Sequence, residues 1–186
     1  QVEPRALILL ESSEFNLYTI ELELRRRFPA LTLLTHLCDV RDRPAVERAF
    51  SLQRPHVVFH AAAYKQVPML ESQEREAVFN NVLGTRTVAQ AADRSGCSEF
   101  VLISTDKAVN PTNVMGATKR FAEMVLQGIV ARGSSMRACM VRFGNVLESS
   151  GSVVPLFREQ IRQGGPVTVT HPEIIRYFMT IPEAAQ

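Results

Sequence analysis

The chain has 186 residues, enough for one domain with its own core, and its 46% hydrophobic and 22% charged content are those of an ordinary globular protein. A formal net charge of +2 does not favour nucleic acid as a partner, and no apolar run approaches the roughly 20 residues that a membrane span needs. The cysteines Cys38, Cys97 and Cys139 lack metal-ligand spacing, which disfavours a zinc site or a disulfide framework and favours reduced thiols in the cytoplasm.

Short apolar runs alternate with longer stretches of helical periodicity. The runs predict strands at 6–10, 31–36, 56–60, 100–104, 138–143 and 167–170, and their continuous apolar character is typical of a parallel sheet. Helices are predicted at 12–27 with Ser13 as the cap, at 43–51, 74–94, 116–132 and 154–163, and a further helix begins near 181. This order predicts a doubly wound α/β sheet, which binds ligands at the carboxyl ends of its strands.

Acidic residues follow the first two predicted strands. Glu11 ends the first strand and Asp39 follows the second. In a dinucleotide-binding fold such acids accept hydrogen bonds from the adenosine ribose and the adenine amino group. The alternative is that both carboxylates only cap helices or order loops.

The third strand leads into the segment HAAAYKQVP. Three small alanines, Ala61, Ala62 and Ala63, would let a flat or phosphorylated ligand approach the backbone. Lys65 can reach a phosphate or a sugar, or can be an ordinary solvent-exposed lysine. His60 is expected to be a buried histidine whose hydrogen bonds are satisfied.

The fourth strand ends in STDK, which places a hydroxyl, a carboxyl group and an amine in sequence at Thr105, Asp106 and Lys107. Such a trio can orient a substrate hydroxyl, donate a proton and accept one. Met115 and Lys119 follow on a predicted helix, four residues apart and therefore on one face. Met115 stands where a Tyr-x-x-x-Lys signature would have its tyrosine, and by itself it is best interpreted as a packing residue.

Seven blocks of sequence together resemble the extended short-chain dehydrogenase/reductases. Within them, the chain is similar to the nucleotide-sugar 4,6-dehydratases of bacterial polysaccharide biosynthesis, in particular the large membrane-anchored UDP-N-acetylglucosamine type. Methionine at the tyrosine position is a feature of that subgroup. The blocks are 13–24, 39–42, 60–71, 80–85, 104–120, 141–157 and 164–186.

The resemblance implies a reaction and assigns roles to residues. NAD or NADP takes hydride from sugar C4, Lys107 removes the C5 proton, Asp106 protonates the departing C6 hydroxyl, and hydride returns to C6. Thr105 with Asp106, Lys107, or a water held by Lys119 would take the 4-hydroxyl proton, and Lys119 would also bind the nicotinamide ribose. The cofactor carries the hydride chemistry and the protein supplies position and proton transfer.

The remaining site residues also follow from the resemblance. It implies a partial Rossmann-like, NAD(P)-binding domain at 1–143 and a partial substrate-binding region at 144–186 that is not an independent domain. Cofactor contacts are expected from Glu11, Ser12, Asp39, Val40, Ala61, Ala62, Ala63, Lys65, Asn81, Lys119 and Phe143, with Thr85 beside Asn81. UDP-sugar contacts are expected from Lys65, Asn145, Val146, Val153, Thr168 and Arg176. No metal is expected.

The sequence departs from the family in two main ways: the glycine-rich phosphate loop is absent, and the C-terminal part of the substrate domain, after Gln186, is expected to be missing. No GxxGxxG occurs in it, so the first βα unit that normally cradles the pyrophosphate is expected to be missing, and with it a central strand. The isolated chain is therefore expected to be largely inactive. The resemblance also allows the parent protein to be anchored to the inner membrane. Glu148 replaces a usual glycine near the presumed diphosphate. Glu11 favours NAD whereas Arg41 could favour NADP, and both remain open.

Two other functions compete with dehydration. A sugar-nucleotide epimerase or reductase could use the same fold, but it needs no acid–base pair for the loss of water at C6. A non-catalytic nucleotide-binding remnant would suit Met115 and the absent glycine loop, but gives no reason to keep Asp106, Lys107 and Lys119 together. A homo-oligomer is expected in either case.

Overall fold

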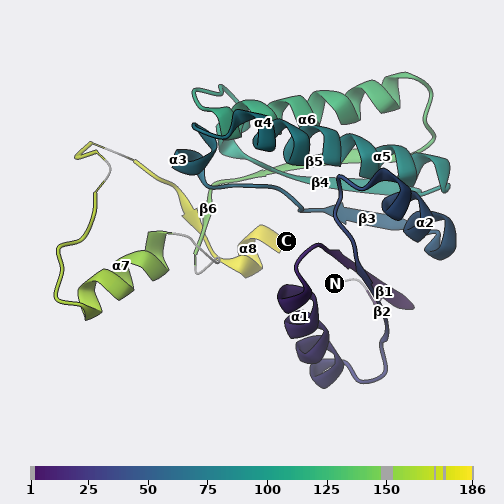
Figure 1. Cartoon of the computed structure of the whole chain (residues 1–186), viewed down its shortest axis with the longest axis horizontal. Helices are drawn as coiled ribbons and strands as arrows, with labels where there is room; N and C mark the ends of the chain where they lie inside the picture. Colours follow the sequence, from purple (N-terminus) through teal and green to yellow (C-terminus); the bar gives the residue numbers. More distant parts are fainter. Residues whose placement is uncertain (1–2, 148–152, 170, 174, 186) are drawn as a thin grey trace. The chain divides into compact units, whose positions relative to one another are not determined.

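The computed structural model describes residues 3–147, 153–169, 171–173 and 175–185 (Figure 1). The chain divides into two units, Gln1–Val141 and Arg142–Gln186. A boundary after residue 143 was expected. The roles expected of the two regions stay predictions.

The first unit contains two parallel sheets. In the first sheet β1 pairs with β2 in parallel, from Ala6 opposite Thr32 to Glu11 opposite Leu37. In the second sheet the order is β3-β4-β5, with β3 parallel to β4. The bounds are β1 Ala6–Glu11, β2 Thr32–Leu37, β3 Val57–His60, β4 Glu99–Thr105 and β5 Arg137–Phe143.

Within the residues that the structure describes, neither β1 nor β3 is paired on its second edge. A strand inserted between them would make one continuous sheet in the order β2-β1-new-β3-β4-β5. Val57 and Phe59 are two residues apart on β3 and therefore share one face of the strand, and their exposed fractions of 42% and 67% show that the described residues leave this face largely uncovered.

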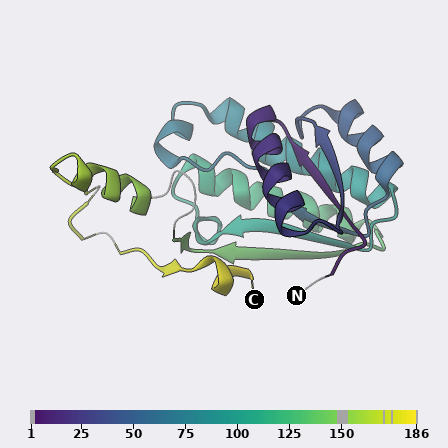
Figure 2. The ribbon, with the colours of Figure 1, turned by 90° about the horizontal axis from the view of Figure 1, so that it is seen from below.

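Helices connect the strands, as the alternating pattern predicts (Figure 2). Ser13 caps α1, because its Oγ accepts a hydrogen bond from the Asn16 amide at 3.3 Å. In Figure 1, α5 and α6 lie side by side, and they contact β3 and β4 respectively. The bounds are α1 Glu14–Arg27, α2 Arg43–Gln53, α3 Val67–Leu70, α4 Glu74–Ala77, α5 Thr85–Arg94 and α6 Val114–Ala131.

The main core lies between the sheets and these helices. It includes Val46 and Phe50 of α2, Phe100 and Leu102 of β4, and Leu126 of α6. The predicted helix 74–94 is interrupted, because Val78–Gly84 (η1) winds as a π-helix between α4 and α5. No helix in the described residues is both long and apolar enough to cross a membrane.

The second unit contains small elements that the sequence analysis only partly predicts. β6 (Asn145–Val146) and β7 (Phe178–Met179) form a short parallel pair, and α8 (Ile181–Ala185) confirms the expected final helix. The strand predicted at 167–170 is wrong over 167–169, and Thr170 lies outside the described residues. The side chain of Gln160, on α7 (Val153–Arg162), instead holds Thr168 by its amide at 3.0 Å and its hydroxyl at 2.8 Å.

Candidate functional site

The turn after β4 carries the predicted acid–base group. Asp106–Ala108 form a single 3-10 turn (η2) directly after Thr105. One oxygen of Asp106, Oδ1, accepts hydrogen bonds from Lys107 Nζ and from Thr105 Oγ1, both at 2.9 Å. The side chain of Asp106 is 45% exposed and that of Lys107 is 25% exposed, so a ligand can reach both.

The charge of this group follows from its surroundings. Partial burial would raise the pKa of Asp106, but hydrogen bonds from Lys107 and Thr105 outweigh it and hold the pKa below its usual value. The turn therefore presents the Asp106 carboxylate in an ion pair with Lys107. A pair of this kind can move a proton from the amine to the carboxylate, from which it can be delivered to a substrate.

Helix α6 lies against the same turn. A Cβ atom placed on Gly116 would lie 2.4 Å from the carbonyl oxygen of Lys107, so only glycine permits this approach. One turn further along, Lys119 Nζ donates to the carbonyl oxygen of Ile103 at 2.5 Å. Burial lowers the pKa of Lys119 to about 8, and the charge of Glu123 acts in the opposite direction. The structure thus brings Lys119 and the end of β4 together.

Met115 is a buried packing residue, which is the role that its sequence position alone favours. It is 5% exposed and lies in a small cluster with Leu70 of α3 and Ala77 of α4. A thioether has no proton to exchange, so Met115 supplies packing beside Gly116 and does not take part in acid–base steps.

Glu11, at the end of β1, and Asp39, after β2, both form hydrogen bonds with residues close to them in the sequence. Glu11 Oε1 accepts from the Ser13 amide at 2.8 Å and from Ser12 Oγ at 3.4 Å. The guanidinium of Arg41 hydrogen-bonds Asp39 and holds the pKa of that carboxyl below its usual value. These contacts are those of loop-ordering acids, while both residues stay only half-buried at the carboxyl edge of the sheet. A cofactor role for them remains a prediction.

The loop after β3 is held by two neighbouring segments. Ala61, Ala62 and Lys65 are exposed and Ala63 is half-buried. Asn81 of η1 accepts from the Tyr64 amide at 2.8 Å and donates to the Tyr64 carbonyl and to Thr118 Oγ1, both at 3.0 Å.

Asn81 and Thr85 are each 1% exposed, so Asn81 holds the loop from a buried position, and Thr85 Oγ1 donates a hydrogen bond to the Asn81 carbonyl oxygen at 2.7 Å. Val40 is also buried, and a Cβ atom on Gly84 would lie 2.8 Å from its Cγ2. These positions shape the loops that follow β2 and β3, and direct contact with a cofactor remains a prediction for each.

His60 is the buried histidine that the sequence analysis expects. It is 4% exposed, and its Nε2 lies 3.0 Å from Thr85 Oγ1. Burial, together with the charge of Lys119, lowers the pKa of His60 to about 3, so the imidazole stays neutral at physiological pH.

Apart from Lys65 in the loop after β3, the residues expected to contact the sugar nucleotide fall in the second unit. Asn145 and Val146 form β6 and Val153 begins α7, while Phe143, which was expected to contact the cofactor, ends β5. Thr168 lies in the loop held by Gln160, and Arg176 is exposed shortly before β7. Glu148 lies outside the described residues. Their roles in substrate binding stay predictions.

Glu123 and Ser104 are buried polar residues beside the site that were not predicted from the sequence. Glu123 of α6 is fully buried, and Ser104 Oγ donates to its Oε1 at 2.6 Å. Glu123 lies four residues after Lys119, a spacing that puts both on one helical face and could have suggested the pair.

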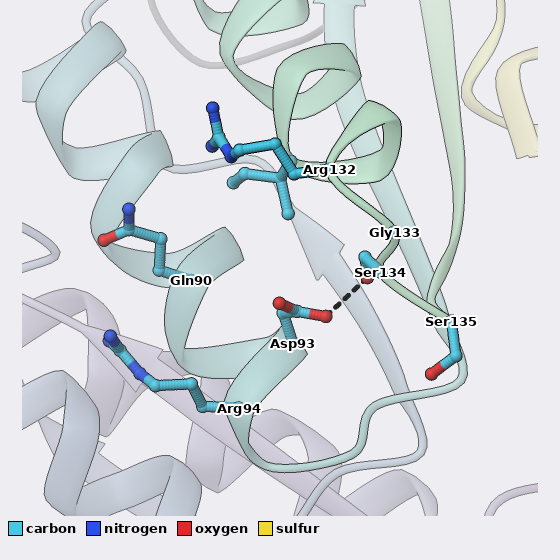
Figure 3. A pocket seen from close by; sticks show the side chains of 8 residues that line it. Gln90, Asp93, Arg94, Arg132, Gly133, Ser134 and Ser135 are labelled. Atoms are coloured by element: carbon cyan, nitrogen blue, oxygen red, sulfur yellow. Dashed lines mark hydrogen bonds between the residues drawn. The ribbon is translucent and has the colours of Figure 1, made fainter.

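A hollow in the first unit lies away from this site (Figure 3). It encloses about 430 Å³ and is lined by the carboxyl-terminal ends of α5 and α6, among them Asp93 and Arg132, and by the turn at Gly133–Ser135. Asp93 accepts a hydrogen bond from Ser134 across it. The acid–base turn lies at the opposite, amino-terminal end of α6.

Comparison with known proteins identifies relatives of the whole chain. Residues 1–186 match the family described as polysaccharide biosynthesis protein. The chain is 53% identical over 185 residues to a probable polysaccharide biosynthesis protein, EpsC of Bacillus subtilis, and covers 99% of itself but 31% of EpsC. It is also 43% identical over 152 residues to a UDP-glucose 4-epimerase of Rickettsia canadensis, with 80% of the chain and 44% of the epimerase covered. The chain thus spans less than half the length of either relative.

Solved structures share the fold. Pen from Bacillus thuringiensis is 35% identical, with a TM-score of 0.89 over 98% of this chain and 56% of Pen. A double mutant of DesIV, a dTDP-glucose 4,6-dehydratase from Streptomyces venezuelae solved with NAD bound, is 20% identical, with a TM-score of 0.82 over 96% of this chain and 60% of DesIV. The match over all 186 residues and the shared strand–helix architecture mean that the chain belongs to the polysaccharide biosynthesis protein family and has a Rossmann-like α/β fold.

Proposed function

We propose that these residues form the acid–base part of a nucleotide-sugar 4,6-dehydratase of the UDP-N-acetylglucosamine type. One observation carries the proposal: Thr105, Asp106 and Lys107 form a hydrogen-bonded, solvent-reachable group at the carboxyl end of a parallel strand, packed against the helix that carries Lys119. Loss of water from a sugar needs a base at one carbon and an acid at the next oxygen. Adjacent residues on one turn provide both.

NAD or NADP is the proposed cofactor, and the residues present fit its nucleoside ends. Glu11 and Asp39 offer carboxylate oxygens at the carboxyl ends of adjacent strands, and the exposed alanines of the β3 loop leave room for a flat group. Lys119 offers an amine near the end of β4 that can donate a hydrogen bond to a ribose hydroxyl. When bound, the nicotinamide supplies hydride acceptance and return, and NAD-bound DesIV shows that this fold accommodates it in a dehydratase.

Thr105, Lys107 and Asp106 each carry out a different proton transfer in the proposed reaction. Thr105, bonded to Asp106, orients the 4-hydroxyl group and relays its proton to solvent. Once C4 is a ketone the C5 hydrogen is acidic, and the neutral Lys107 amine removes it as a proton. Asp106 donates a proton to the C6 hydroxyl group, which departs as water, and Lys107 returns a proton to C5 when C6 is reduced.

The ion pair between Asp106 and Lys107 imposes a condition on these proton transfers. Lys107 must be neutral to act as a base and Asp106 must be protonated to act as an acid, whereas the isolated turn holds the ionised pair. One proton must therefore pass from Nζ to Oδ1 along their 2.9 Å hydrogen bond. Exclusion of water by a bound substrate favours the neutral pair, because low polarity disfavours separated charges.

The second candidate is a 4-epimerase, which the 43% identity to the Rickettsia canadensis protein favours. An epimerase oxidises C4 and returns hydride to the same carbon, so it needs neither a base at C5 nor an acid at C6. The two functions therefore make opposite predictions for Lys107.

The test uses the complete gene product that contains these residues, incubated with UDP-N-acetylglucosamine and NAD or NADP. The wild type is expected to yield a 4-keto-6-deoxy sugar, identified by NMR and mass spectrometry. Lys107→Ala is expected to abolish water loss while still permitting C4 oxidation, and Asp106→Asn to slow water loss by about 100-fold or more. The exposed Arg86 on α5 provides the control Arg86→Ala, expected to remain active. A fully active Lys107→Ala enzyme, or a product changed only at C4, would contradict the proposal.

A further inference from the structure

Helix α6 contacts the end of β4 and the following turn at three points along one stripe. Gly116 lies against the Lys107 carbonyl, Lys119 Nζ bonds the Ile103 carbonyl at 2.5 Å, and Glu123 Oε1 accepts from Ser104 Oγ at 2.6 Å. Positions i, i+3 and i+7 share a helix face, so the three contacts form a continuous seam. Packing alone would need only small or apolar residues there.

The far end of this seam is polar and fully buried. Glu123 is 0% exposed, Ser104 is 6% exposed and Lys119 is 6% exposed. A carboxylate in such a place is unfavourable unless it is hydrogen-bonded and compensated by positive charge. Ser104 supplies a hydrogen bond, and Arg120 lies 3.0 Å away as an ion-pair partner.

The same carboxylate acts electrostatically on Lys119. Burial lowers the pKa of Lys119, and the negative charge of Glu123 on α6 partly restores it. From β3, the imidazole of His60 is coupled to Lys119 but is kept neutral by burial. Within the described residues, Glu123 is thus the acid that supports the ammonium form of Lys119.

Ser104 immediately precedes the acid–base turn. Its neighbours on the two sides are Ile103, which Lys119 holds, and Thr105, which hydrogen-bonds Asp106. Any shift of Ser104 along β4 therefore moves the turn relative to α6.

We propose that Glu123 and Ser104 are positioning residues that hold the carboxyl end of β4 in register with α6, so that Asp106 and Lys107 act on the same sugar as Lys119. This inference rests on the proposed function for its catalytic consequence, but the contacts themselves do not. Neither residue needs to touch the substrate.

The first test is kinetic and uses the complete gene product with UDP-N-acetylglucosamine. Ser104→Ala and Glu123→Gln are expected to lower kcat by about 10- to 100-fold, as a displacement of catalytic groups does, with KM changed by about twofold at most. Ser104→Thr keeps the hydroxyl group and is expected to restore most of the activity. Glu99→Gln, at the start of the same strand, is the matched control and is expected to behave like the wild type.

The second test needs no turnover. NMR of lysine labelled with 13C and 15N in this chain follows the titration of Lys119, and Glu123→Gln is expected to move its midpoint to lower pH, whereas Glu99→Gln leaves it in place. An unchanged midpoint in Glu123→Gln, or a Ser104→Ala enzyme with wild-type kcat, would overturn the inference. If the wild type forms no 4-keto-6-deoxy sugar but the Lys119 midpoint moves as expected, the proposed function fails while the electrostatic contact stands.

Discussion

At the scale of single residues, the site depends on how closely a turn can approach a helix. Gly116 is the position where that approach is tightest, since the Lys107 carbonyl oxygen occupies the space of a side chain. Helical glycine is otherwise unfavourable by up to about 1 kcal/mol relative to alanine. Its presence in the first turn of α6 is explained by the contact and not by helix stability.

Two glycines of α6 allow this to be tested. Gly116→Ala is expected to displace the Lys107 backbone, to lower the free energy of unfolding by about 1–3 kcal/mol and to reduce turnover strongly. Gly128→Ala is the control, because a Cβ atom there would meet only the Arg132 side chain at 3.8 Å. That variant is expected to be stabilised by up to about 1 kcal/mol, since alanine is the better helix former. Urea unfolding of both variants measures the contrast, and equal stabilisation would contradict the close approach.

A second residue-scale prediction concerns His60. Burial and the charge of Lys119 lower the pKa of His60 from 6.5 to about 3. The unfolded chain therefore binds a proton below pH 6.5 that the folded chain does not. Stability should fall as the pH drops from 6.5 towards 5, approaching about 1.4 kcal/mol per pH unit.

Urea unfolding across this pH range is the measurement. His60→Gln is expected to flatten the slope, whereas His171→Gln, at an exposed position, should keep it. A wild-type stability that does not change between pH 6.5 and pH 5 would show that His60 is protonated in the folded chain.

At the scale of helices and strands, the π-helix η1 gives the site its support. The wider winding of Val78–Gly84 buries Asn80 and Asn81, and Asn81 joins the loop after β3 to α6 through Tyr64 and Thr118. π-helical segments are uncommon and are frequently found at functional sites. Here the segment places the Asn81 side chain so that it hydrogen-bonds both the N–H and the carbonyl group of Tyr64.

Removing that amide should loosen the loop. Asn81→Leu leaves the Tyr64 amide and carbonyl without their partner, which is expected to destabilise the fold by about 1–3 kcal/mol. Hydrogen exchange of the Tyr64 amide should accelerate more than that of amides in β1, and affinity for NAD should fall. Asn110→Leu, in an exposed loop, is the control. Unchanged exchange at Tyr64 in Asn81→Leu would exclude this supporting role.

Most elements could be predicted because their signals are local. Continuous apolar runs mark β1 to β5, and Ser13 marks the start of α1. The π-helix could not be predicted, because its residues have ordinary helical periodicity and only tertiary contacts decide the winding. The strand prediction was wrong over 167–169, because the alternating pattern carries no information about the Gln160 side chain that holds the loop.

At the scale of the whole chain, the arrangement of the two sheets explains which residues of the candidate site could be predicted from the sequence. The carboxyl ends of β1 to β4 were predicted to carry the polar residues, and the rule that ligands bind at that edge selects Asp106 and Lys107 without any structure. Glu123 could not be recognised, since a glutamate in an amphipathic helix is most often on the surface. Its burial appears only when β4 supplies Ser104.

The edges of β1 and β3 also carry a prediction for the whole chain. A parallel strand placed between them would pair with both edges, and a helix that follows it would cover the face of β3 that carries Phe59 and Val57. Adding, in trans, a peptide with an apolar strand, a glycine-rich turn and a helix is expected to raise the melting temperature of the chain and its affinity for NAD. A peptide with proline in the strand is the control, since proline cannot complete a ladder. Equal effects of the two peptides would argue against strand insertion.

The central claim is that Lys107 and Asp106 remove water from the sugar between C5 and C6. Running the reaction of the complete gene product in D2O tests it most directly. We expect one solvent deuterium at C5 of a 4-keto-6-deoxy product, with the original C4 hydrogen recovered at C6. A product inverted at C4 with no deuterium at C5 would contradict the claim and assign the chain to epimerisation.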